Sequence, residues 1–162
     1  MEIGRGGIHY RRADINDIEV LVDCRVRCLN ELYNHLEDDE TKILRKALRE
    51  YFREAIPSND FVGWLAEYNG RIIATSGMVL WKIPPRYGVV ESGKLGYILN
   101  FYTIPEARRK GIGTRLLKQL IEEATSLGLR YLHLHASEYG IDLYRKAGFA
   151  KPEQVELELR LE

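Results

Sequence analysis

The stretch KLGYILNFYTIPEARRKGIGTRLLKQLIEEA, residues 94–124, joins a strand, a basic loop and a helix in one continuous segment. Residues 94–104 predict a long strand that Pro105 closes, because proline cannot continue a central ladder. From Ile112 to about Leu127, apolar side chains recur at the spacing of one helix face. The pattern therefore predicts a strand that leads through a basic loop into an amphipathic helix.

The basic loop is predicted to bind an anion, most naturally a phosphate or pyrophosphate. A helix N-terminus offers unpaired N–H groups and the positive end of the macrodipole, and Gly111 and Gly113 let a ligand approach the backbone closely. The alternative is a surface turn with solvated charges. A dinucleotide fingerprint would need glycine at Leu116, and a nucleotide P-loop would need Gly-Lys-Ser/Thr; the sequence has neither.

The remaining elements follow from periodicity, caps and turns. Asp14 is a plausible N-cap for the first helix, and Asn69-Gly70 is a strong hairpin signal. The predicted elements are a strand at 8–13, helices from 14 to about 32 and from 38 to 56, a hairpin at 61–81, a strand at 130–137, a short helix at 139–148 and a last strand at 154–161.

This order, β-α-α-β-β-β-α-β-α-β, predicts a mixed α/β (α+β) domain. We expect a central mixed, mostly antiparallel sheet flanked by helices. The length of 162 residues fits a single domain spanning residues 1–162, with disorder considered for residues 1–7.

Charge and composition limit the classes of partner that we expect for this protein and indicate where in the cell we expect it. The 24 basic and 24 acidic residues cancel, so binding to nucleic acid or to an acidic membrane surface is not expected. The sequence has no run of about 20 apolar residues and no signal-peptide pattern at its start, so a cytoplasmic protein is the default. Cys24 and Cys28 lack a zinc spacing, and His133 and His135 fit an ordinary sheet face, so we expect no metal.

Two segments together resemble a known family. YILNFYTIPEARRKGIGTRLLKQLIEEA contains Arg108-x-x-Gly111-x-Gly113, and LHLHASEYGIDLYRKAGF contains Leu-Tyr-x-Lys-x-Gly-Phe at residues 143–149. This pair of motifs resembles the GNAT superfamily of N-acetyltransferases, firmly over residues 95–149. The resemblance implies acetyl-CoA as co-substrate and direct acetyl transfer to a primary amine of a small molecule or peptide.

The resemblance also implies where the co-substrate binds. The loop would hold the CoA pyrophosphate through backbone N–H groups, and the end of the preceding strand, which splays from its neighbour, would bind the pantetheine arm. The implied cofactor-binding residues are Phe101, Tyr102, Thr103, Arg108, Arg109, Lys110, Gly111, Ile112, Gly113, Thr114 and Ser137.

Tyr144 is the predicted catalytic residue, a general acid that protonates the departing sulfur; packing is the alternative. The sequence departs from the commonest family pattern at two positions. Ser137 stands where many members have asparagine, and Leu99 stands where many have a catalytic glutamate. The general base is thus unassigned. Its candidates are Glu138, His135, Glu91 and a water chain held by Asn100 and backbone carbonyls.

The acceptor amine is not identified by the sequence. Arg25 interrupts the apolar stripe of the first helix and is a candidate for binding an acidic group of the acceptor, and Asn100 is a second candidate substrate residue. Residues 30–39 and 82–93 are expected to line the acceptor cleft. A non-catalytic acyl-CoA-binding module on the same fold is the alternative function, and a homodimer is considered for the assembly.

Overall fold

The computed structural model of the chain describes residues 7–89 and 93–161. The expectation of disorder at residues 1–7 falls largely on residues 1–6, which lie outside the described residues. The described part contains β1 (Ile8–Arg12), α1 (Ile18–Tyr33), α2 (Asp39–Ala55), β2 (Phe61–Tyr68), β3 (Arg71–Lys82), β4 (Lys94–Thr103), α3 (Ile112–Ser126), β5 (Leu132–His133) and α4 (Ile141–Lys146), with 3-10 turns at Ile15–Asp17 and Pro105–Ala107.

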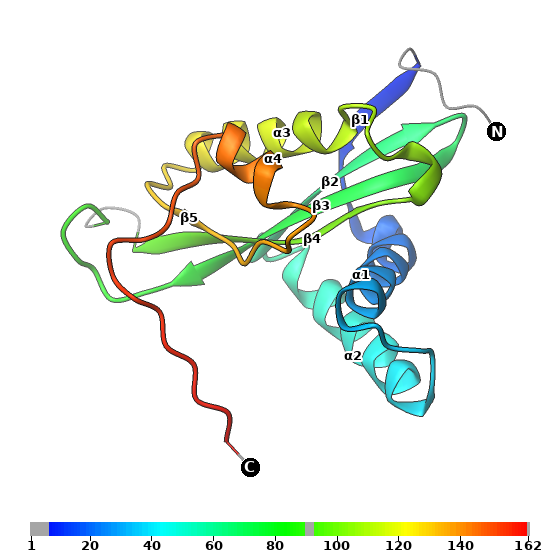
Figure 1. The fold of residues 1–162 in the computed structure, drawn as a ribbon, viewed down its shortest axis with the longest axis horizontal. Coiled ribbons are helices and arrows are strands. Elements are labelled where there is room, and N and C mark those ends of the chain that lie inside the picture. Colours follow the sequence, from blue (N-terminus) through cyan, green and yellow to red (C-terminus); the bar gives the residue numbers. More distant parts are fainter. Residues whose placement is uncertain (1–6, 90–92, 162) are drawn as a thin grey trace.

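Within the described ranges, the strands form one sheet in the order β1-β2-β3-β4-β5. Neighbours from β1 to β4 are antiparallel, and β5 runs parallel to β4. Helices α3 and α4 lie over one face of the sheet, and α1 and α2 lie under the other (Figure 1). The predicted mixed α/β fold with a mostly antiparallel sheet is confirmed.

Side-chain caps lie at the start of the 3-10 turn that leads into α1 and at the start of α2. Asp14 accepts a hydrogen bond from the Asn16 N–H, and Asp14 and Asp17 form a capping box around the turn that precedes α1. Asp38 caps α2 in the same way with Thr41 as its partner. These caps fix where the turn before α1 and where α2 begin, and so they position the two helices that cover one face of the sheet.

Each face of the sheet has its own buried core. Under α3 the core includes Met78, Ile98, Leu117, Leu120 and Tyr144. Facing α1 and α2, another cluster is built from Leu21, Val22, Phe52, Phe61, Leu65 and their neighbours. Burial of these side chains supplies the main driving force for packing helices on both faces, and it fixes the sheet between them.

A β-bulge interrupts the pairing of β3 with β4. Thr75 pairs with Tyr102 but Gly77 pairs with Leu99, so two residues of β4 lie opposite one residue of β3. Asn100 sits in this bulge with a left-handed φ of 55°, and the Thr75 hydroxyl donates to its carbonyl at 2.9 Å. The bulge therefore alters the course of β4 in its second half.

The end of the chain departs from the prediction. Residues 154–161 were predicted to form a last strand, but the structure pairs none of them with the sheet. The predicted strand at 130–137 is also reduced to Leu132–His133. An alternating sequence forms a strand only where a neighbouring strand supplies backbone partners, and residues 154–161 run clear of the sheet (Figure 1).

No helix within the described residues combines the length and apolar character that crossing a membrane requires.

The bulge generates a prediction about Gly77. A Cβ at Gly77 would lie 2.6 Å from the Phe61 ring and 3.3 Å from Asn100 Cβ. Gly77→Ala is therefore expected to lower the free energy of unfolding by about 1–3 kcal/mol, because a tightly packed core must shift to admit a methyl group. Denaturant unfolding followed by circular dichroism measures this change.

Ser76→Ala is the matched control. Its hydroxyl is buried without a hydrogen-bond partner among the described residues, so removing that hydroxyl should leave stability nearly unchanged. Equal stability of the Gly77→Ala variant and the wild type would show that the glycine is not needed for this packing.

Candidate functional site

The sheet opens between β4 and β5. The two strands pair only at Gly96↔Leu132 and Tyr97↔His133. Beyond Tyr97, β4 continues to Thr103 with no strand on its β5 side among the described residues. This open edge offers backbone N–H and C=O groups to an extended ligand, as the implied pantetheine site requires.

The loop between β4 and α3 carries unused backbone donors. Arg109 has a left-handed φ of 62°, and Gly111, which precedes α3, has a φ of 82°. Within the described residues, the backbone N–H groups of Arg109 and of residues 111–114 donate no hydrogen bond. A left-handed residue that directs successive N–H groups into one space at a helix start is suited to an anion.

Arg108 is already engaged by α1. Its guanidinium donates to both carboxylate oxygens of Glu31, at 2.9 and 2.7 Å, and to the Thr103 carbonyl at 2.9 Å. It also lies 5.6 Å from the centre of the Tyr102 ring, and the Tyr102 hydroxyl donates to Glu31. Arg108 thus ties the loop and the end of β4 to α1, a long-range contact that sequence reasoning missed.

Gly113 brings α3 close to the end of β4. A Cβ there would lie 3.4 Å from the Phe101 ring and 3.5 Å from a Leu143 methyl group. Both are ordinary van der Waals distances, so one carbon atom fits at Gly113, whereas a branched side chain would need more room.

Tyr144 lies where these elements meet. Its ring makes edge-to-face contacts with Phe101 and Phe149, both with centroids 5.9 Å away. Burial, with a smaller contribution from Cys28, raises the pKa of Tyr144 to about 12. The phenol therefore holds its proton throughout the physiological pH range and is available as a proton donor.

Cys28, on α1, reaches the same part of β4, Phe101, that Tyr144 contacts from α4. Its thiol donates to the Phe101 carbonyl at 3.6 Å, and burial raises its pKa, so it is a neutral thiol at pH 7. Cys24 is buried, whereas Cys28 is only half-buried. The sequence carries no signal that α1 would bring this residue to the edge of β4.

Ser137 and Asn100 take different positions relative to the opening. Ser137 precedes α4, and its carbonyl accepts the N–H groups of Gly140 and Ile141 at 3.0 Å. Asn100 is only 1% exposed, and its amide donates to the Leu21 carbonyl at 3.4 Å. The prediction that Asn100 contacts substrate stays a prediction; in this structure its side chain is buried, and its Oδ1 atom has no hydrogen-bond partner among the described residues.

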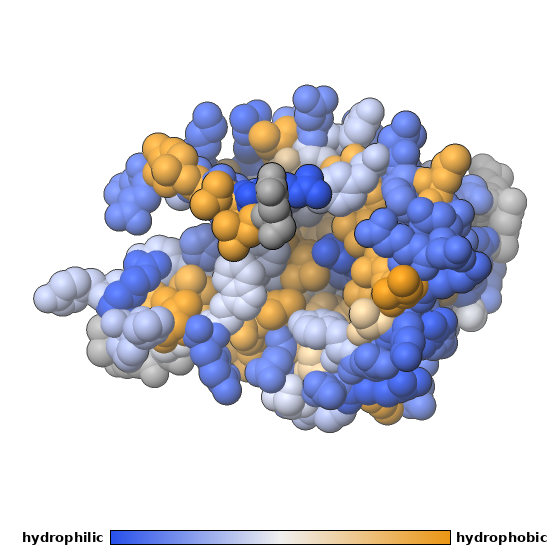
Figure 2. Space-filling view, turned by 90° about the horizontal axis from the view of Figure 1, so that it is seen from below, coloured by the Kyte–Doolittle hydropathy of each residue, from blue (hydrophilic) through white to orange (hydrophobic). Residues whose placement is uncertain are grey.

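A polar and aromatic cluster lies on the α1 side of the sheet. Tyr97 stacks on Trp81 with ring centroids 4.5 Å apart, and the Tyr97 hydroxyl is hydrogen-bonded to His135 Nδ1. His135 Nε2 in turn lies 3.5 Å from the Glu156 carboxylate. On the face seen from below, Figure 2 shows a hollow whose floor is largely hydrophobic and whose rim is mostly hydrophilic.

Arg25 reaches this cluster from α1. Burial raises the pKa of both Tyr51 and Tyr97, and the nearby charge of Arg25 opposes the rise in each. Among the described residues, the guanidinium of Arg25 forms no ion pair or hydrogen bond. Arg25 is thus a half-buried cation whose charge acts on the hydroxyls of both Tyr51 and Tyr97.

Two further side chains are candidates for the general base, Glu138 and Glu91. Glu138 is exposed, and its carboxylate makes no hydrogen bond or ion pair within the described part of the chain. Glu91 lies outside the described residues. Leu99 pairs with Gly77, so no carboxylate stands at that position of β4.

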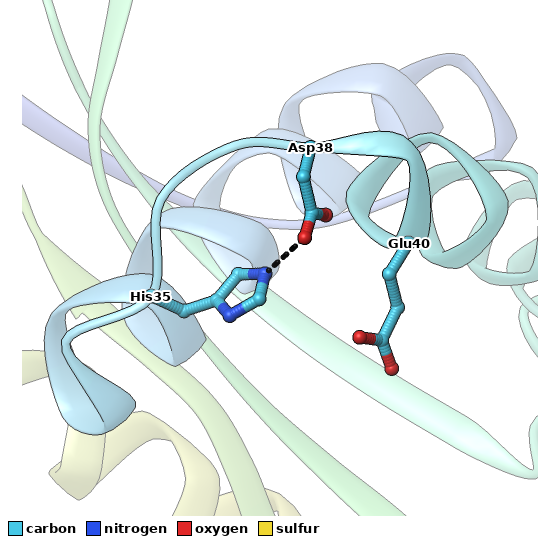
Figure 3. A group of neighbouring side chains, drawn as sticks. All are labelled: His35, Asp38 and Glu40. Atoms are coloured by element: carbon cyan, nitrogen blue, oxygen red, sulfur yellow. Dashed lines mark ion pairs between the residues drawn. The ribbon is translucent and has the colours of Figure 1, made fainter.

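One group of potential metal ligands lies away from this opening, at the start of α2 (Figure 3). His35, Asp38 and Glu40 bring one ligand atom each to within 4.8 Å of one another, and all three are exposed. Asp38 already accepts the Thr41 N–H at 2.9 Å and lies 3.3 Å from His35. Helix capping explains this cluster, so it does not support a metal site.

Comparison with known proteins points to one family. The model of the acetyltransferase (GNAT) family matches residues 29–149, which is more than half of the chain. A search of curated proteins found no match.

Solved structures agree in fold over most of the chain. A predicted acetyltransferase with acetyl-CoA from Clostridium acetobutylicum is 37% identical, with a TM-score of 0.83, and covers 93% of this chain and 96% of its own. A GCN5-related N-acetyltransferase from Ralstonia eutropha is 25% identical with a TM-score of 0.82, covering 94% and 99%. Glucosamine-6-phosphate N-acetyltransferase from Arabidopsis thaliana, 18% identical with a TM-score of 0.67 and covering 96% and 99%, shares the fold. With the family match over residues 29–149, these findings show that the chain belongs to the GNAT family of acetyltransferases.

Proposed function

We propose that this chain transfers the acetyl group of acetyl-CoA directly to a primary amine of a small molecule or peptide, with Tyr144 as general acid. One observation carries the proposal. The buried phenol of Tyr144 lies against Phe101 at the open edge of β4, and the same strand leads directly into the loop with unused N–H groups. One extended ligand, with a thioester at one end and a pyrophosphate at the other, would engage both ends of this opening.

In this proposal, acetyl-CoA is bound by backbone N–H groups and by the positive charges of a few side chains. The N–H groups of Arg109 and of residues 111–114 bind the pyrophosphate, and Thr114 lies in the first turn of α3. The open edge of β4 from Phe101 to Thr103 pairs with the pantetheine arm, and Ser137 faces the arm from the β5 side. Arg108 acts by holding the loop to Glu31, whereas Arg109 and Lys110 add positive charge around the phosphates.

The proposed reaction forms a carbon–nitrogen bond, breaks a carbon–sulfur bond and moves two protons. The amine nitrogen attacks the acetyl carbonyl carbon, and the carbon–sulfur bond breaks with its electron pair going to sulfur. Tyr144 gives its proton to that sulfur, and solvent then returns a proton to the phenolate. Backbone N–H groups at the open edge of β4 stabilise the oxygen while it is negatively charged.

His135 is the proposed base for the amine proton. Of the two side-chain candidates that the structure describes, His135 and Glu138, it is the one with a hydrogen-bonded partner on the α1 side, the hydroxyl of Tyr97. Glu156 faces its other ring nitrogen, so the ring is oriented from both sides. The amine proton reaches His135 through the Tyr97 hydroxyl, whose oxygen takes that proton as it gives its own to Nδ1. His135 then loses a proton to solvent, which balances the proton that Tyr144 gives away.

The acceptor is proposed to carry an acidic group that Arg25 binds. A half-buried guanidinium without a carboxylate partner among the described residues is satisfied best by an anion that arrives with the substrate. Family membership supports acetyl transfer to an amine, and Arg25 narrows the expected acceptors to amines that also bear a carboxylate or phosphate. The non-catalytic acyl-CoA-binding module is less well supported, because it gives no role to Tyr144.

Tyr144→Phe tests the enzyme against the module. Removing one oxygen preserves the ring contacts with Phe101 and Phe149, so acetyl-CoA affinity is expected to stay within about twofold. The transfer rate is expected to fall roughly 10- to 10,000-fold, with the low end favoured because a thiolate is itself a fair leaving group. The readout is thiol release with an amine that the wild type acetylates, alongside calorimetric titration of acetyl-CoA.

Tyr139→Phe is the matched control, because Tyr139 is 99% exposed and should be replaceable without effect. A Tyr144→Phe variant with wild-type turnover would leave Tyr144 as a packing residue. A wild type that binds acetyl-CoA and acetylates nothing in a broad amine panel would favour the module.

Arg25→Gln tests the acidic acceptor. For amines that carry a carboxylate, KM is expected to rise roughly 10- to 100-fold, the range for losing a hydrogen bond to a charged group. For the matching carboxamides, KM should change little. Steady-state kinetics on carboxylate and carboxamide pairs of the same amine separate the two effects.

Arg27→Gln is the control on the same helix, since Arg27 is paired with Asp23 at 2.8 Å. Equal KM changes for the carboxylate and the carboxamide in the Arg25→Gln variant would refute charge recognition by Arg25.

A further inference from the structure

Trp81 and Tyr97 form an aromatic pair on the α1 side of the sheet. Their rings are stacked, with centroids 4.5 Å apart and planes that differ by 15°. Tyr97 is half-buried, whereas Trp81 is 46% exposed, and its indole N–H has no hydrogen-bond partner among the described residues. The pair therefore offers an exposed aromatic surface with a free hydrogen-bond donor at its edge.

Packing between neighbouring strands explains only part of this arrangement. Tyr97 pairs with Val79, two residues before Trp81, so the two rings are diagonal neighbours on one face of the sheet. Phe52 and Phe61, which belong to the core on the same side, are only 1% and 2% exposed. A ring that served the core alone would be covered in the same way. A single exposed ring is ordinary, so the argument depends on the groups around it.

Three different groups meet at Tyr97. Trp81 stacks on its ring, and its hydroxyl is hydrogen-bonded to His135, the proposed base. The charge of Arg25 also acts on Tyr97, and this guanidinium forms no ion pair or hydrogen bond within the described part of the chain. An aromatic surface, a route for an amine proton and an unpaired cation are thus gathered around one side chain.

The charges near Tyr97 have the polarity of an amino acid. Burial raises the pKa of Tyr97, the charge of Glu156 adds to the rise, and the charge of Arg25 opposes it, so both charged groups lie near the hydroxyl. A ligand with an ammonium and a carboxylate meets one charge of the opposite sign for each group. A polyamine has no acidic group for Arg25, and its second cation would be repelled there.

We propose that the acceptor is an aromatic amino acid, whose ring lies on Trp81, whose carboxylate binds Arg25 and whose amine approaches the Tyr97 hydroxyl. In such a molecule the amine and the carboxylate share one carbon atom, and the ring is attached to the next. This close spacing matches three groups gathered around one side chain. The inference rests on the proposed function for the position of the acceptor, and it narrows the class of acceptor.

Binding is tested apart from turnover, with saturating CoA in place of acetyl-CoA so that no acetyl group can be transferred. Calorimetric titration compares phenylalanine with norleucine, whose side chain is aliphatic. Phenylalanine is expected to bind roughly 3- to 10-fold more tightly, because stacked rings attract one another beyond the area that they bury.

Tryptophan emission reports where the ring binds. The chain has two tryptophans, and the other, Trp64, is held by Glu123 at 2.8 Å. Phenylalanine is therefore expected to change the emission of the wild type through Trp81. Trp81→Leu keeps an apolar side chain but removes the ring, so this variant should bind phenylalanine and norleucine equally and show no change in emission.

Tyr139→Leu is the matched control, because Tyr139 is 99% exposed and this variant should keep the preference for phenylalanine. Three results each overturn the proposal: no binding of phenylalanine up to millimolar concentration, equal dissociation constants for the two amino acids in the wild type, or a preference that persists in Trp81→Leu.

Failure of this inference and failure of the proposed function give different results. Phenylalanine that binds on Trp81, in a protein that acetylates no amine in a broad panel, would support the ring site and refute acetyl transfer. A wild type that acetylates aliphatic amines and does not bind phenylalanine would support acetyl transfer and refute the ring site.

Discussion

The short contact between β4 and β5 is the constraint on which the site depends. Gly96 permits it, because a Cβ there would lie 2.5 Å from a Leu132 methyl group and 2.7 Å from the Met78 sulfur. Past Tyr97 the strands part, and α4 packs its tyrosine against Phe101. If β4 and β5 paired over more residues, the edge of β4 would be closed to a ligand. If they did not pair at all, nothing would hold β5 and α4 against the sheet.

Backbone N–H groups and charged side chains contribute differently to the expected attraction for an anion. The chain is neutral overall, and Arg108, the first basic residue of the loop, is neutralised by Glu31. Attraction for an anion therefore rests on the N–H groups at the start of α3 and on the charge around Arg109. The same Glu31 contact ties the loop to α1, which also carries Cys28 and Arg25. One helix thus links the loop proposed to bind the donor with the side of the sheet proposed to bind the acceptor.

Sequence patterns predicted the elements that depend on local signals. Asp14, Asp38 and the Asn69-Gly70 turn mark boundaries that the structure confirms, because caps and turns act over a few residues. The Arg108–Glu31 pair could not be foreseen, since it joins residues 77 positions apart. The last strand was expected from alternation alone, and alternation specifies a face without specifying a partner. The left-handed bulge at Asn100 was not predicted, because it has no periodic signature in the sequence.

Amide hydrogen exchange with and without saturating acetyl-CoA tests the central claim most directly. The account predicts that exchange slows at least tenfold at Arg109, at residues 111–114 and at the open edge of β4, where N–H groups gain oxygen partners. The turn at Gly128, which lies at the far end of α3, should exchange at the same rate in both samples. Protection confined to other segments, in a sample that acetyl-CoA demonstrably stabilises against heat, would contradict the account and place the donor elsewhere.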